Sequence, residues 1–380
     1  MMKVLEIGTL NVKKGGPPFS LSRQMYGLKA EGIESVCLMP PCPIEDIIDM
    51  SLDYVFTNAP CFSFLGSNFI PNITGILRNI SNIDIIHFQG MITYPEHIVS
   101  RYATKNKIPY IVAPRGSLYK KALQNKWLKK KAVWYGYLKK DLNRASCLQA
   151  TCVAEMEEIR NLGCNTPIAV IPNPYDGLQI ATGTKQDDSC FTIGYMGRLN
   201  PRKHVEKLIY ALDYLRKEGI PARLVVIGSE IETYEKFLKN ETIKYGLDNN
   251  VEFTGFLKDE EKESAIRKCH IFAFPSDFEN WGNVVSDVMV RGIPAIATYG
   301  MPWEVLNAEH CGWWIRNEQS IINQTLMDAY RQGFEKLKIM GERARSVILK
   351  DYSVEVVGAM LNELYSWILG GGAKPDFVYL

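Results

Sequence analysis

Short apolar segments alternate with segments of helical periodicity along most of the chain. In the first half, continuous apolar runs predict buried strands at residues 4–7, 35–38, 83–87, 110–113 and 147–150. Several of these strands are separated by predicted helices at residues 19–30, 94–104, 127–142 and 154–162. Strands and helices that alternate in this way indicate a doubly wound parallel sheet of the α/β class.

The alternation stops at residues 171–190 and then starts again. This stretch combines Pro172, Pro174 and Gly177 with a polar run at 184–189, a composition typical of a linker between domains. Beyond it, strands are predicted at residues 191–196, 223–227, 251–254, 271–274 and 295–298, and helices at 205–218, 232–245, 260–268 and 284–291. From about residue 316 the chain is predicted to be helical, and it ends in an amphipathic helix at 354–369.

A chain of 380 residues exceeds the usual size of a single core, so the pattern predicts two α/β domains. We place the first domain at residues 1–172, the linker at 173–190, the second domain at 191–350, and a C-terminal helix and tail at 351–380. Ligands of open α/β sheets bind beyond the carboxyl ends of the strands. The residues that directly follow each strand are therefore the candidates for a binding site.

Composition and charge narrow the classes of function. A net charge of +2 argues against nucleic acid as a partner. The nine cysteines form no CxxC pair and no spacing typical of zinc, which favours reduced thiols in the cytosol. The first apolar run is too short for a signal peptide, and no run is long enough to span a bilayer. We therefore expect a cytoplasmic protein, which at most lies on the inner face of the plasma membrane.

The segment after the predicted strand at 271–274 carries the most specific motif. Glu279 lies in the loop, Asn283 is the predicted N-cap of the next helix, and Asp287 lies one turn inside it. The backbone amides at 282–285 would then point outward, unpaired, at the positive end of that helix and could bind an anion. Two carboxylates beside an anion site suit a ligand with phosphate and hydroxyl groups. The alternative is a tight turn with two solvated acids.

Two further clusters also follow predicted strands. After the strand at 191–196, Gly197 permits a tight turn, and Arg198 and Lys203 can converge on one dianion. Cations at a helix start oppose the helix dipole, so stability alone would not select them. After the first strand, Gly15 and Gly16 allow a ligand to approach the backbone, although they form no GxGxxG fingerprint.

Together these motifs resemble those of the family 4 (group 1) retaining glycosyltransferases of the GT-B fold. The resemblance is carried by Glu279, Asp287, the turn at residues 291–294, and Gly197, Arg198 and Lys203, with Gly15-Gly16 and residues 171–173 as further matches. It covers almost the whole chain. It implies an α/β fold of two Rossmann-like, doubly wound domains that face a central cleft, with the C-terminal helix crossing back to the first domain.

The resemblance also implies a role for each matched residue. Arg198 and Lys203 would neutralise the donor diphosphate, Glu279 would hold the transferred sugar, and Asp287 would bind the nucleotide ribose. Phe256 and Leu257, which follow the strand at 251–254, would border the base. The remaining donor-binding candidates lie on glycine-containing turns: Gly15, Gly16, Asn280, Trp281, Gly282, Asn283 and Val284.

At three positions the role implied by the resemblance is changed or left open. Asp287 is one methylene shorter than the family's usual glutamate, so its ribose contact would be altered or water-mediated. Arg115 stands where the family often has histidine; it cannot act as a general base, but it could bind a phosphate or stabilise leaving-group charge. His87 either positions the acceptor or is a structural histidine. We include Arg115 and His87 among the catalytic candidates, with Glu279, Arg198 and Lys203. His270, at the start of a strand, is predicted to be structural.

Residues 120–144 contain many lysines, interleaved with aromatic residues, against the single acid Asp141. A basic, aromatic-rich helix suits an anionic membrane surface as a partner. The alternative is a half-buried helix with a solvated basic face.

The sequence thus predicts a glycosyltransferase that moves a sugar from a nucleotide-diphosphate sugar to a glycan or lipid-linked glycan acceptor, in bacterial surface polysaccharide synthesis. The resemblance implies retention of configuration. No DxD-type motif is convincingly placed, so no obligatory metal and no cofactor besides the donor are expected. The alternatives are a nucleotide-sugar epimerase of the same fold, a dinucleotide oxidoreductase, and a non-catalytic sugar-binding relative.

Overall fold

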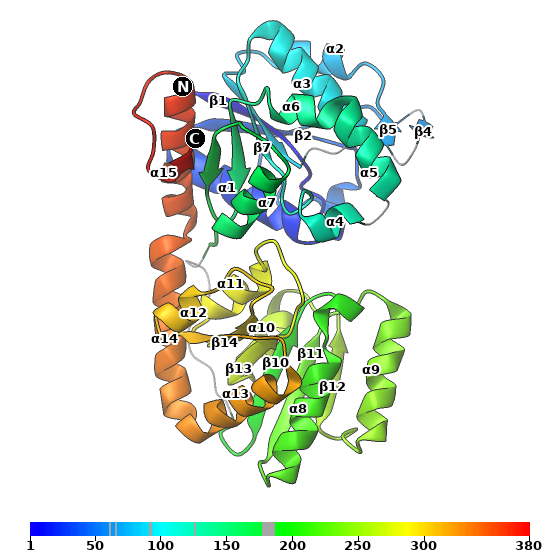
Figure 1. Ribbon diagram of the computed structural model, residues 1–380, viewed down its shortest axis with the longest axis vertical. Helices are drawn as coiled ribbons and strands as arrows, with labels where there is room; N and C mark the ends of the chain where they lie inside the picture. The colour runs from blue at the N-terminus through cyan, green and yellow to red at the C-terminus, as the bar shows by residue number, and fades with distance from the viewer. Residues whose placement is uncertain (61, 65–66, 91–92, 125–126, 177–186) are drawn as a thin grey trace. The chain divides into compact units, whose positions relative to one another are not determined.

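The computed structural model describes residues 1–60, 62–64, 67–90, 93–124, 127–176 and 187–380. The chain forms two compact units, of which the first comprises Met1–Asp176 with Tyr352–Leu380 and the second comprises Gly177–Asp351 (Figure 1). Each unit is built on a mainly parallel sheet with helices on both faces.

The first sheet has the strand order β16-β9-β8-β7-β6-β1-β2-β3. Its strands are β1 (Lys3–Ile7), β2 (Glu34–Met39), β3 (Tyr54–Phe56), β6 (Ile85–Gln89), β7 (Tyr110–Ala113), β8 (Cys147–Ala150), β9 (Ile168–Val170) and the antiparallel β16 (Val378–Tyr379). The hairpin β4 (Phe62–Phe64) and β5 (Ser67–Phe69) lies outside this sheet. The helices are α1 (Gly16–Ala30), α2 (Ile73–Asn79), α3 (Tyr94–Asn106), α4 (Lys120–Gln124), α5 (Trp127–Val133), the π-helix η3 (Trp134–Leu138), α6 (Lys139–Leu142), α7 (Val153–Asn161) and α15 (Val354–Ile368).

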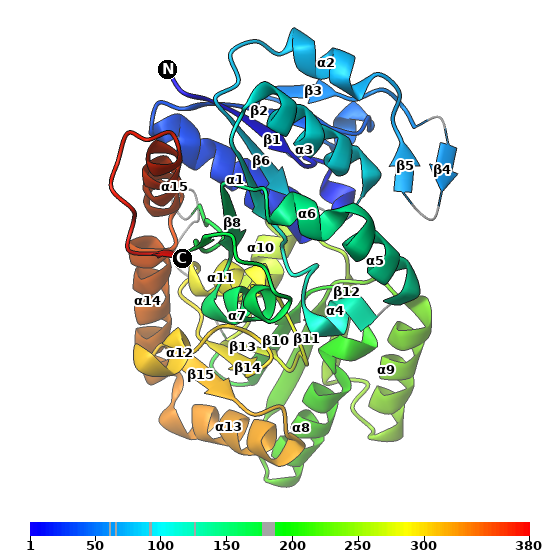
Figure 2. The ribbon, with the colours of Figure 1, turned by 45° about the horizontal axis from the view of Figure 1, so that its top comes forward.

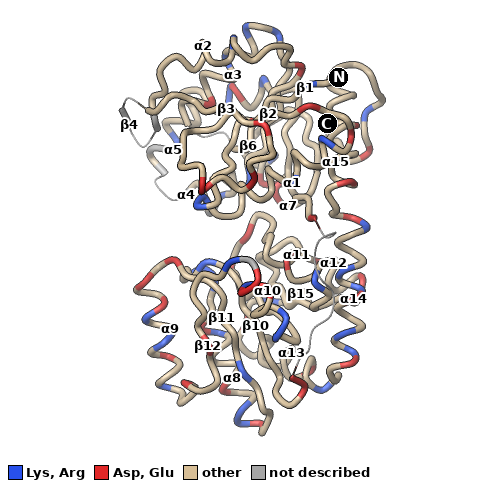
Figure 3. The backbone as a smooth tube through the Cα atoms, turned by 180° about the vertical axis from the view of Figure 1, so that it is seen from behind, with Lys and Arg blue, Asp and Glu red and all other residues tan. Residues whose placement is uncertain are grey.

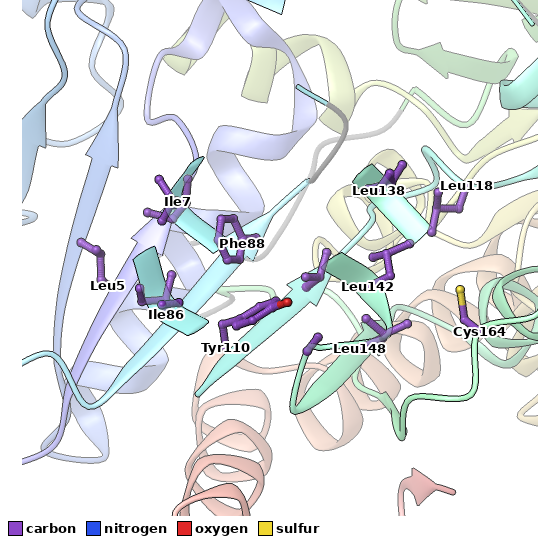
Figure 4. Packing of buried hydrophobic residues seen from close by; sticks show 14 of the residues in the cluster. Leu5, Ile7, Ile86, Phe88, Tyr110, Leu118, Leu138, Leu142, Leu148 and Cys164 are labelled. Carbon is purple, nitrogen blue, oxygen red and sulfur yellow. The ribbon is translucent and has the colours of Figure 1, made fainter. Parts of the chain in front are cut away.

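Neighbouring residues of these strands enter different cores, as expected for the period of two in a β-strand. Leu5, Ile86 and Val112 pack with residues of α2, α3 and α6 on one face. Figure 4 shows Leu5 and Ile86 of this cluster with Leu142 of α6. Val4, Ile85 and Ile111 pack with α1 and α15 on the other face. Because both faces are covered, the strands are continuous apolar runs, and this is why the sequence predicts them well.

The C-terminal helix α15 lies beside α1, as predicted for a chain that crosses back to its first domain (Figure 2). Val357, Leu361 and Leu364 are fully buried against the sheet. The two helices cross at Gly27 and Gly358, where a Cβ atom on Gly27 would lie 2.4 Å from the Val354 carbonyl oxygen. A side chain on either glycine would therefore push the helices apart.

The second sheet has the strand order β12-β11-β10-β13-β14-β15. Its strands are β10 (Phe191–Met196), β11 (Ala222–Ile227), β12 (Val251–Gly255), β13 (Ile271–Phe274), β14 (Ala295–Thr298) and β15 (Gly312–Ile315). The helices are α8 (Glu206–Lys217), α9 (Glu232–Lys244), α10 (Asp259–Arg267), α11 (Asn283–Met289), α12 (Val305–Ala308), α13 (Gln319–Gln332) and α14 (Phe334–Asp351). Acidic and basic residues alternate along α9 (Figure 3), where they form ion pairs such as Lys236–Glu232.

Both sheets reverse their direction of winding at one point, between β1 and β6 in the first unit and between β10 and β13 in the second. Ligands of doubly wound folds bind at such switch points, beyond the carboxyl ends of the two strands. The loops after these four strands are therefore the expected ligand-binding loops.

The structure confirms the predicted α/β class and the two doubly wound units. The boundaries of some elements differ from the prediction where contacts between distant segments determine them. β6 begins and ends two residues later than predicted, which places His87 in the middle of the strand. The helix predicted at 127–142 is interrupted by the π-helix η3. Of the predicted linker at 173–190, residues 177–186 lie outside the described part of the chain. No helix among the described residues is long and apolar enough to cross a bilayer.

Candidate active site

Lys203 and Glu279 meet at the switch point of the second sheet. Lys203 ends the 3-10 turn η4 (Pro201–Lys203), which follows β10, and Glu279 lies in the loop after β13. The Nζ atom of Lys203 forms an ion pair with Oε1 of Glu279, and the two side chains retain only 11% and 16% of their exposure. The pairing confirms that these two predicted site residues lie together.

The loop after β10 is shaped by its own sequence. Gly197 has a φ of 147°, and the Asn200 side chain accepts a hydrogen bond from the Arg202 amide, which starts the turn that carries Lys203. His204 has a left-handed φ of 51° and places its Nε2 atom 2.6 Å from Oδ2 of Asp277. The Asp277 amide also donates to the Arg202 carbonyl at 3.0 Å. These bonds join the loops after β10 and β13.

A third loop, after β14, supports the position of Glu279. The Glu279 amide donates to the Gly300 carbonyl at 2.8 Å. Only glycine fits at position 300, because a Cβ atom there would lie 2.3 Å from the Asp277 carbonyl oxygen. Trp303 donates from its indole to the Trp281 carbonyl at 2.6 Å, and their rings pack at 5.0 Å. The side chain of Trp281, only 5% exposed, thus supports the loop from within, so a donor contact at this position would come from its backbone.

The start of α11 differs from the prediction in one respect. Gly282, with a φ of 83°, is the residue that precedes the helix, and Asn283 is its first helical residue. The Val285 amide donates to the Gly282 carbonyl at 2.9 Å, so it is not available to a ligand. The predicted N-cap at Asn283 and the predicted set of outward amides at 282–285 are therefore wrong in these details. Asn280, Gly282 and Val284 remain partly exposed beside Glu279.

Arg198 is 60% exposed at its side chain and donates from Nη1 to Glu230 at 2.8 Å. Burial lowers the pKa of Lys203 to about 7, and the positive charges of Arg202 and Arg198 act in the same direction. The negative charge of Glu230 opposes this shift by favouring the ammonium form. A negatively charged ligand at this position would also favour the ammonium form, so the cluster is suited to anion binding.

Asp287 lies on α11 and is held between two cations. Its Oδ2 atom lies 2.6 Å from Nζ of Lys262 on α10, and its Oδ1 atom lies 2.9 Å from Nη1 of Arg291. Arg291 also pairs with Glu263. Any hydroxyl that binds Asp287 must therefore share a carboxylate that already has two charged partners.

Phe256 and Leu257 follow β12 on the same carboxyl edge. Gly255 ends the strand with a φ of 69°. Phe256 is 71% exposed, and Leu257 is partly buried. An exposed ring at this edge is available to pack against a flat ligand group.

In the first unit, His87 is a structural residue. It is completely buried in β6, and its Nδ1 atom lies 2.8 Å from the Tyr365 hydroxyl of α15 and 3.2 Å from Nε2 of Gln24. Burial, with the charge of Arg115, lowers the pKa of His87 to about 3, which keeps the ring neutral. The placement of His87 among the catalytic candidates was therefore wrong, because the sheet and α15 enclose the side chain.

Arg115 lies two residues after the end of β7 and has a left-handed φ of 51°. Its Nη2 atom donates to Gln89 at 2.5 Å and to Gln24 at 3.0 Å, and its Nη1 atom donates to Asn173. The same two glutamines donate from their amide groups to the buried carboxylate of Glu6, at 2.9 Å from Gln24 and 2.8 Å from Gln89. Two amide bridges therefore link a guanidinium with a buried carboxylate at the carboxyl edge of the first sheet.

Gly15 and Gly16 stand at the start of α1, after β1. Gly15 has a φ of 84°, and a Cβ atom on it would meet no atom within 4 Å. The glycine is required here by its backbone conformation, and the open space beside it allows a ligand to approach.

Family comparisons agree with this geometry. Residues 24–176 match the model described as Glycosyltransferase Family 4, and residues 182–347 match Glycosyl transferases group 1. The chain belongs to the group 1 glycosyltransferases. Its fold is GT-B: HepE from Anabaena, solved in complex with UDP, superposes with a TM-score of 0.76 at 16% identity and covers 97% of this chain and 100% of its own.

Two curated relatives indicate the range of this glycosyltransferase family. A putative colanic acid biosynthesis glycosyltransferase, WcaL of Escherichia coli, is 26% identical over 44% of this chain and 43% of its own. A GDP-mannose:cellobiosyl-diphosphopolyprenol alpha-mannosyltransferase of Xanthomonas oryzae is 22% identical over 65% of this chain and 64% of its own. The chain thus spans less than two thirds of the length of either relative.

Several residues of this glycosyltransferase's polar networks are not predicted by the sequence. Glu6, Gln24 and Gln89 were not among the candidates, although an acid inside an apolar strand was a signal for Glu6, because buried carboxylates are rare without partners. No comparable sequence feature marks His204 and Asp277, which join the loops after β10 and β13. His270, predicted to be structural, is buried and stacks on Phe334 at 4.3 Å. In the described part of the chain, no group of three His, Cys, Asp or Glu side chains could hold a metal ion.

Proposed function

We propose that this protein transfers a sugar from a nucleotide-diphosphate sugar to a glycan or lipid-linked glycan acceptor, with retention of configuration and without an obligatory metal. The observation that carries the proposal is the ion pair of Lys203 with Glu279 at the carboxyl edge of β10 and β13, with Arg198 nearby on the same loop as Lys203. A buried cation beside a carboxylate provides one group for a diphosphate and one for the hydroxyls of a sugar.

When the bond between sugar and diphosphate breaks, negative charge develops on the leaving oxygen. Lys203 and Arg198 would stabilise that charge by fixed electrostatics, without a metal ion. Binding of the diphosphate would draw Lys203 away from Glu279, which frees the carboxylate to accept hydrogen bonds from sugar hydroxyls. With retention, the leaving phosphate would take the proton of the attacking acceptor hydroxyl on the same face of the sugar.

The nature of the donor and acceptor is inferred from the relatives. HepE is solved with UDP and with UDP-glucose, and the Xanthomonas relative is named for GDP-mannose and a diphosphopolyprenol-linked acceptor. Together they support a nucleotide-diphosphate sugar as donor and a lipid-linked glycan as acceptor for this chain. WcaL supports a place in surface polysaccharide synthesis.

Ligand binding tests the donor site directly. We expect UDP or GDP to raise the unfolding temperature of the wild-type protein, because a ligand that binds only the folded state stabilises it. Lys203→Met and Arg198→Ala should weaken that shift and lower kcat by about 10²-fold or more. Lys239→Met, on the exposed face of α9, is the matched control and should change neither quantity. Full transfer by both site variants would refute the proposal.

Two further assays define the reaction. Transfer that persists in EDTA would support metal independence, and its loss, restored by a divalent cation, would refute it. Incubation with the donor alone would release an epimerised sugar if the protein were an epimerase, whereas a transferase requires an acceptor for sugar transfer.

We also propose that residues 120–144 contact an anionic membrane surface when the acceptor is lipid-linked. Leu128 and Tyr135, spaced by two helical turns, are 67% and 74% exposed, and the charged Lys131 and Lys140 are exposed on the same segment. Leu128→Glu with Tyr135→Glu should reduce pelleting with phosphatidylglycerol vesicles, whereas Ile243→Glu, at an equally exposed apolar position on α9, should not. Equal pelleting of all variants, or none by the wild type, would refute this part of the proposal.

A further inference from the structure

His97 forms a pair with an aspartate that the donor site does not use. Its Nδ1 atom lies 2.6 Å from Oδ2 of Asp141 on α6. The Asp141 side chain is only 4% exposed, whereas His97 keeps 16% of its exposure. Since an ionised carboxylate can only accept, Nδ1 carries the shared hydrogen, and Nε2 of a neutral ring is left as a hydrogen-bond acceptor. Within the described residues, Nε2 makes no hydrogen bond.

Three further aromatic rings are linked to His97 by ring contacts. Tyr137, on the π-helix η3, packs on the imidazole with ring centroids 4.5 Å apart. Tyr94 lies 5.9 Å from His97, and Phe69 stacks on Tyr94 at 6.3 Å. Phe69 and Tyr94 are 39% and 38% exposed. The result is a row of four rings, which we call the aromatic row, with one polar acceptor inside it.

The aromatic row lies on the side of the first sheet where ligands of this topology bind. His97 and Tyr94 are in the first turn of α3, a few residues after the carboxyl end of β6, and β6 is one of the two strands at the switch point. Three separate elements supply the rings: β5, α3 and η3. π-Helices are rare and frequently occur at functional sites, and here η3 directs Tyr137 onto the imidazole.

We propose that the aromatic row of Phe69, Tyr94, His97 and Tyr137 binds a sugar ring of the acceptor, with Nε2 of His97 accepting a hydrogen bond from one of its hydroxyls. A pyranose has an apolar C–H face, which packs on an aromatic ring, and an edge of hydroxyls, which needs acceptors and donors. The aromatic row offers both, in the combination of apolar lining and few polar groups that is typical of ligand sites. This inference rests on the proposed transferase function.

Charge favours a neutral sugar over a phosphate at this place. Asp141, on α6, pairs with His97, and Glu96 precedes His97 in the first turn of α3, where it accepts a hydrogen bond from the Thr93 hydroxyl. The carboxylate of Asp141 would repel a phosphate, whereas sugar hydroxyls donate to carboxyl oxygens. Glu96 adds an acceptor more than a charge, because burial raises its pKa to about 7. Asp141 acts through His97 as a positioning residue that fixes the orientation of the ring.

Two variants separate the hydrogen bond from the aromatic contact. His97→Asn keeps a donor near the position of Nδ1 for Asp141 but removes Nε2. Tyr94→Leu keeps apolar bulk but removes the aromatic face. Arg101→Gln, an exposed position one turn further along α3, is the matched control.

Saturation-transfer NMR of the full chain with p-nitrophenyl glycosides of glucose, galactose, mannose and N-acetylglucosamine measures sugar binding, and the UDP-induced thermal shift of the same samples reports on the second unit. We expect at least one glycoside to bind the wild type, with its Kd raised tenfold or more by His97→Asn and severalfold by Tyr94→Leu. Arg101→Gln should leave the Kd unchanged, and every variant should keep the UDP shift.

An unchanged glycoside Kd in His97→Asn would overturn the inference, as would a wild type that binds UDP but no glycoside. A wild type without any nucleotide shift would instead count against the proposed donor site. The two failures are therefore distinguishable.

Discussion

At the scale of single residues, two charged groups are buried in the elements next to the switch points. Lys203 and Glu6 each lie where burial opposes ionisation, and each is held by specific partners: Glu279 for the first, Gln24 and Gln89 for the second. Groups with strongly shifted pKa values are enriched at functional sites. Their titration therefore provides a direct experimental test of the site.

Lys203 should make nucleotide binding depend on pH. Burial, with Arg202 and Arg198, lowers the pKa of Lys203 to about 7 in the free protein. The ammonium form is the one that attracts a diphosphate, and it is lost as the pH rises through that value, so affinity is highest below it. We expect the Kd for UDP to rise about tenfold or more from pH 7 to 9. Lys203→Arg stays charged and should remove most of that slope, as calorimetry at several pH values would show; the same slope in both proteins would contradict the assignment.

Glu6 should limit the reaction at acidic pH. Burial raises its pKa to about 7, so the carboxyl group becomes protonated as the pH falls through that value. Protonation places an O–H donor against the amide donors of Gln24 and Gln89, which breaks a bridge to Arg115. We expect kcat to fall below about pH 7 in the wild type. The kcat of Glu6→Gln should be low and nearly independent of pH between 5.5 and 8. If kcat of this variant still falls at acidic pH, Glu6 is not the group that causes the fall.

At the scale of elements, close backbone contacts matter as much as apolar faces. The periodicity of α15 predicts which residues are buried, but not the partner against which they pack. That partner is set by Gly27 on α1 and Gly358 on α15, which allow the two backbones to touch. The π-helix η3 is a second example, because nothing in the periodicity of residues 127–142 distinguishes it from an ordinary helical turn.

Gly27→Ala should therefore destabilise the first unit. The new Cβ atom would lie 2.4 Å from the Val354 carbonyl oxygen, so the helices must separate. Overpacking of this kind costs about 1–3 kcal/mol, against the gain of up to about 1 kcal/mol that alanine usually brings to a helix. Gly136→Ala, where a Cβ would meet no atom within 4 Å, is the matched control and should not destabilise. Urea unfolding monitored by circular dichroism distinguishes these outcomes.

At the scale of the whole molecule, the chain contains two units with separate sheets, and the first is completed by residues from both ends of the chain. The apolar face of β6 and β7 that α15 covers would be open to water without Tyr352–Leu380. The donor-site candidates Arg198, Lys203 and Glu279 all belong to the second unit. Stability and nucleotide binding should therefore respond to different substitutions.

Calorimetry can resolve this division. We expect UDP to raise the unfolding temperature of one component of the heat-capacity curve, that of the second unit. Leu361→Ala, which removes a fully buried side chain of α15, should lower the other component, at a cost of about 2–5 kcal/mol. A single transition that both UDP and the substitution move together would show that the units do not unfold separately.

The sequence by itself determined the strands and helices that are long and regular, since burial on both faces leaves an unbroken apolar run. It also indicated the loops of the proposed donor site, because Gly197, Lys203 and Glu279 stand in the loops that follow β10 and β13. The strands β3 and β9 were not predicted, since their three residues leave no readable period. β15 was also not predicted, and beyond Gly312 it is only partly buried.

Only the tertiary structure decided which polar residues are accessible. His87 and Trp281 have the residue types of a site, yet contacts with Tyr365 and Trp303, distant in sequence, enclose them. Conversely, Gln89 donates a hydrogen bond to Glu6, and Asp141 pairs with His97. No local sequence pattern links the members of either pair. Burial and hydrogen-bond partners depend on the packing of distant segments, whereas periodicity and turn chemistry are local; this is why the sequence predicted the framework and the loops but not the networks.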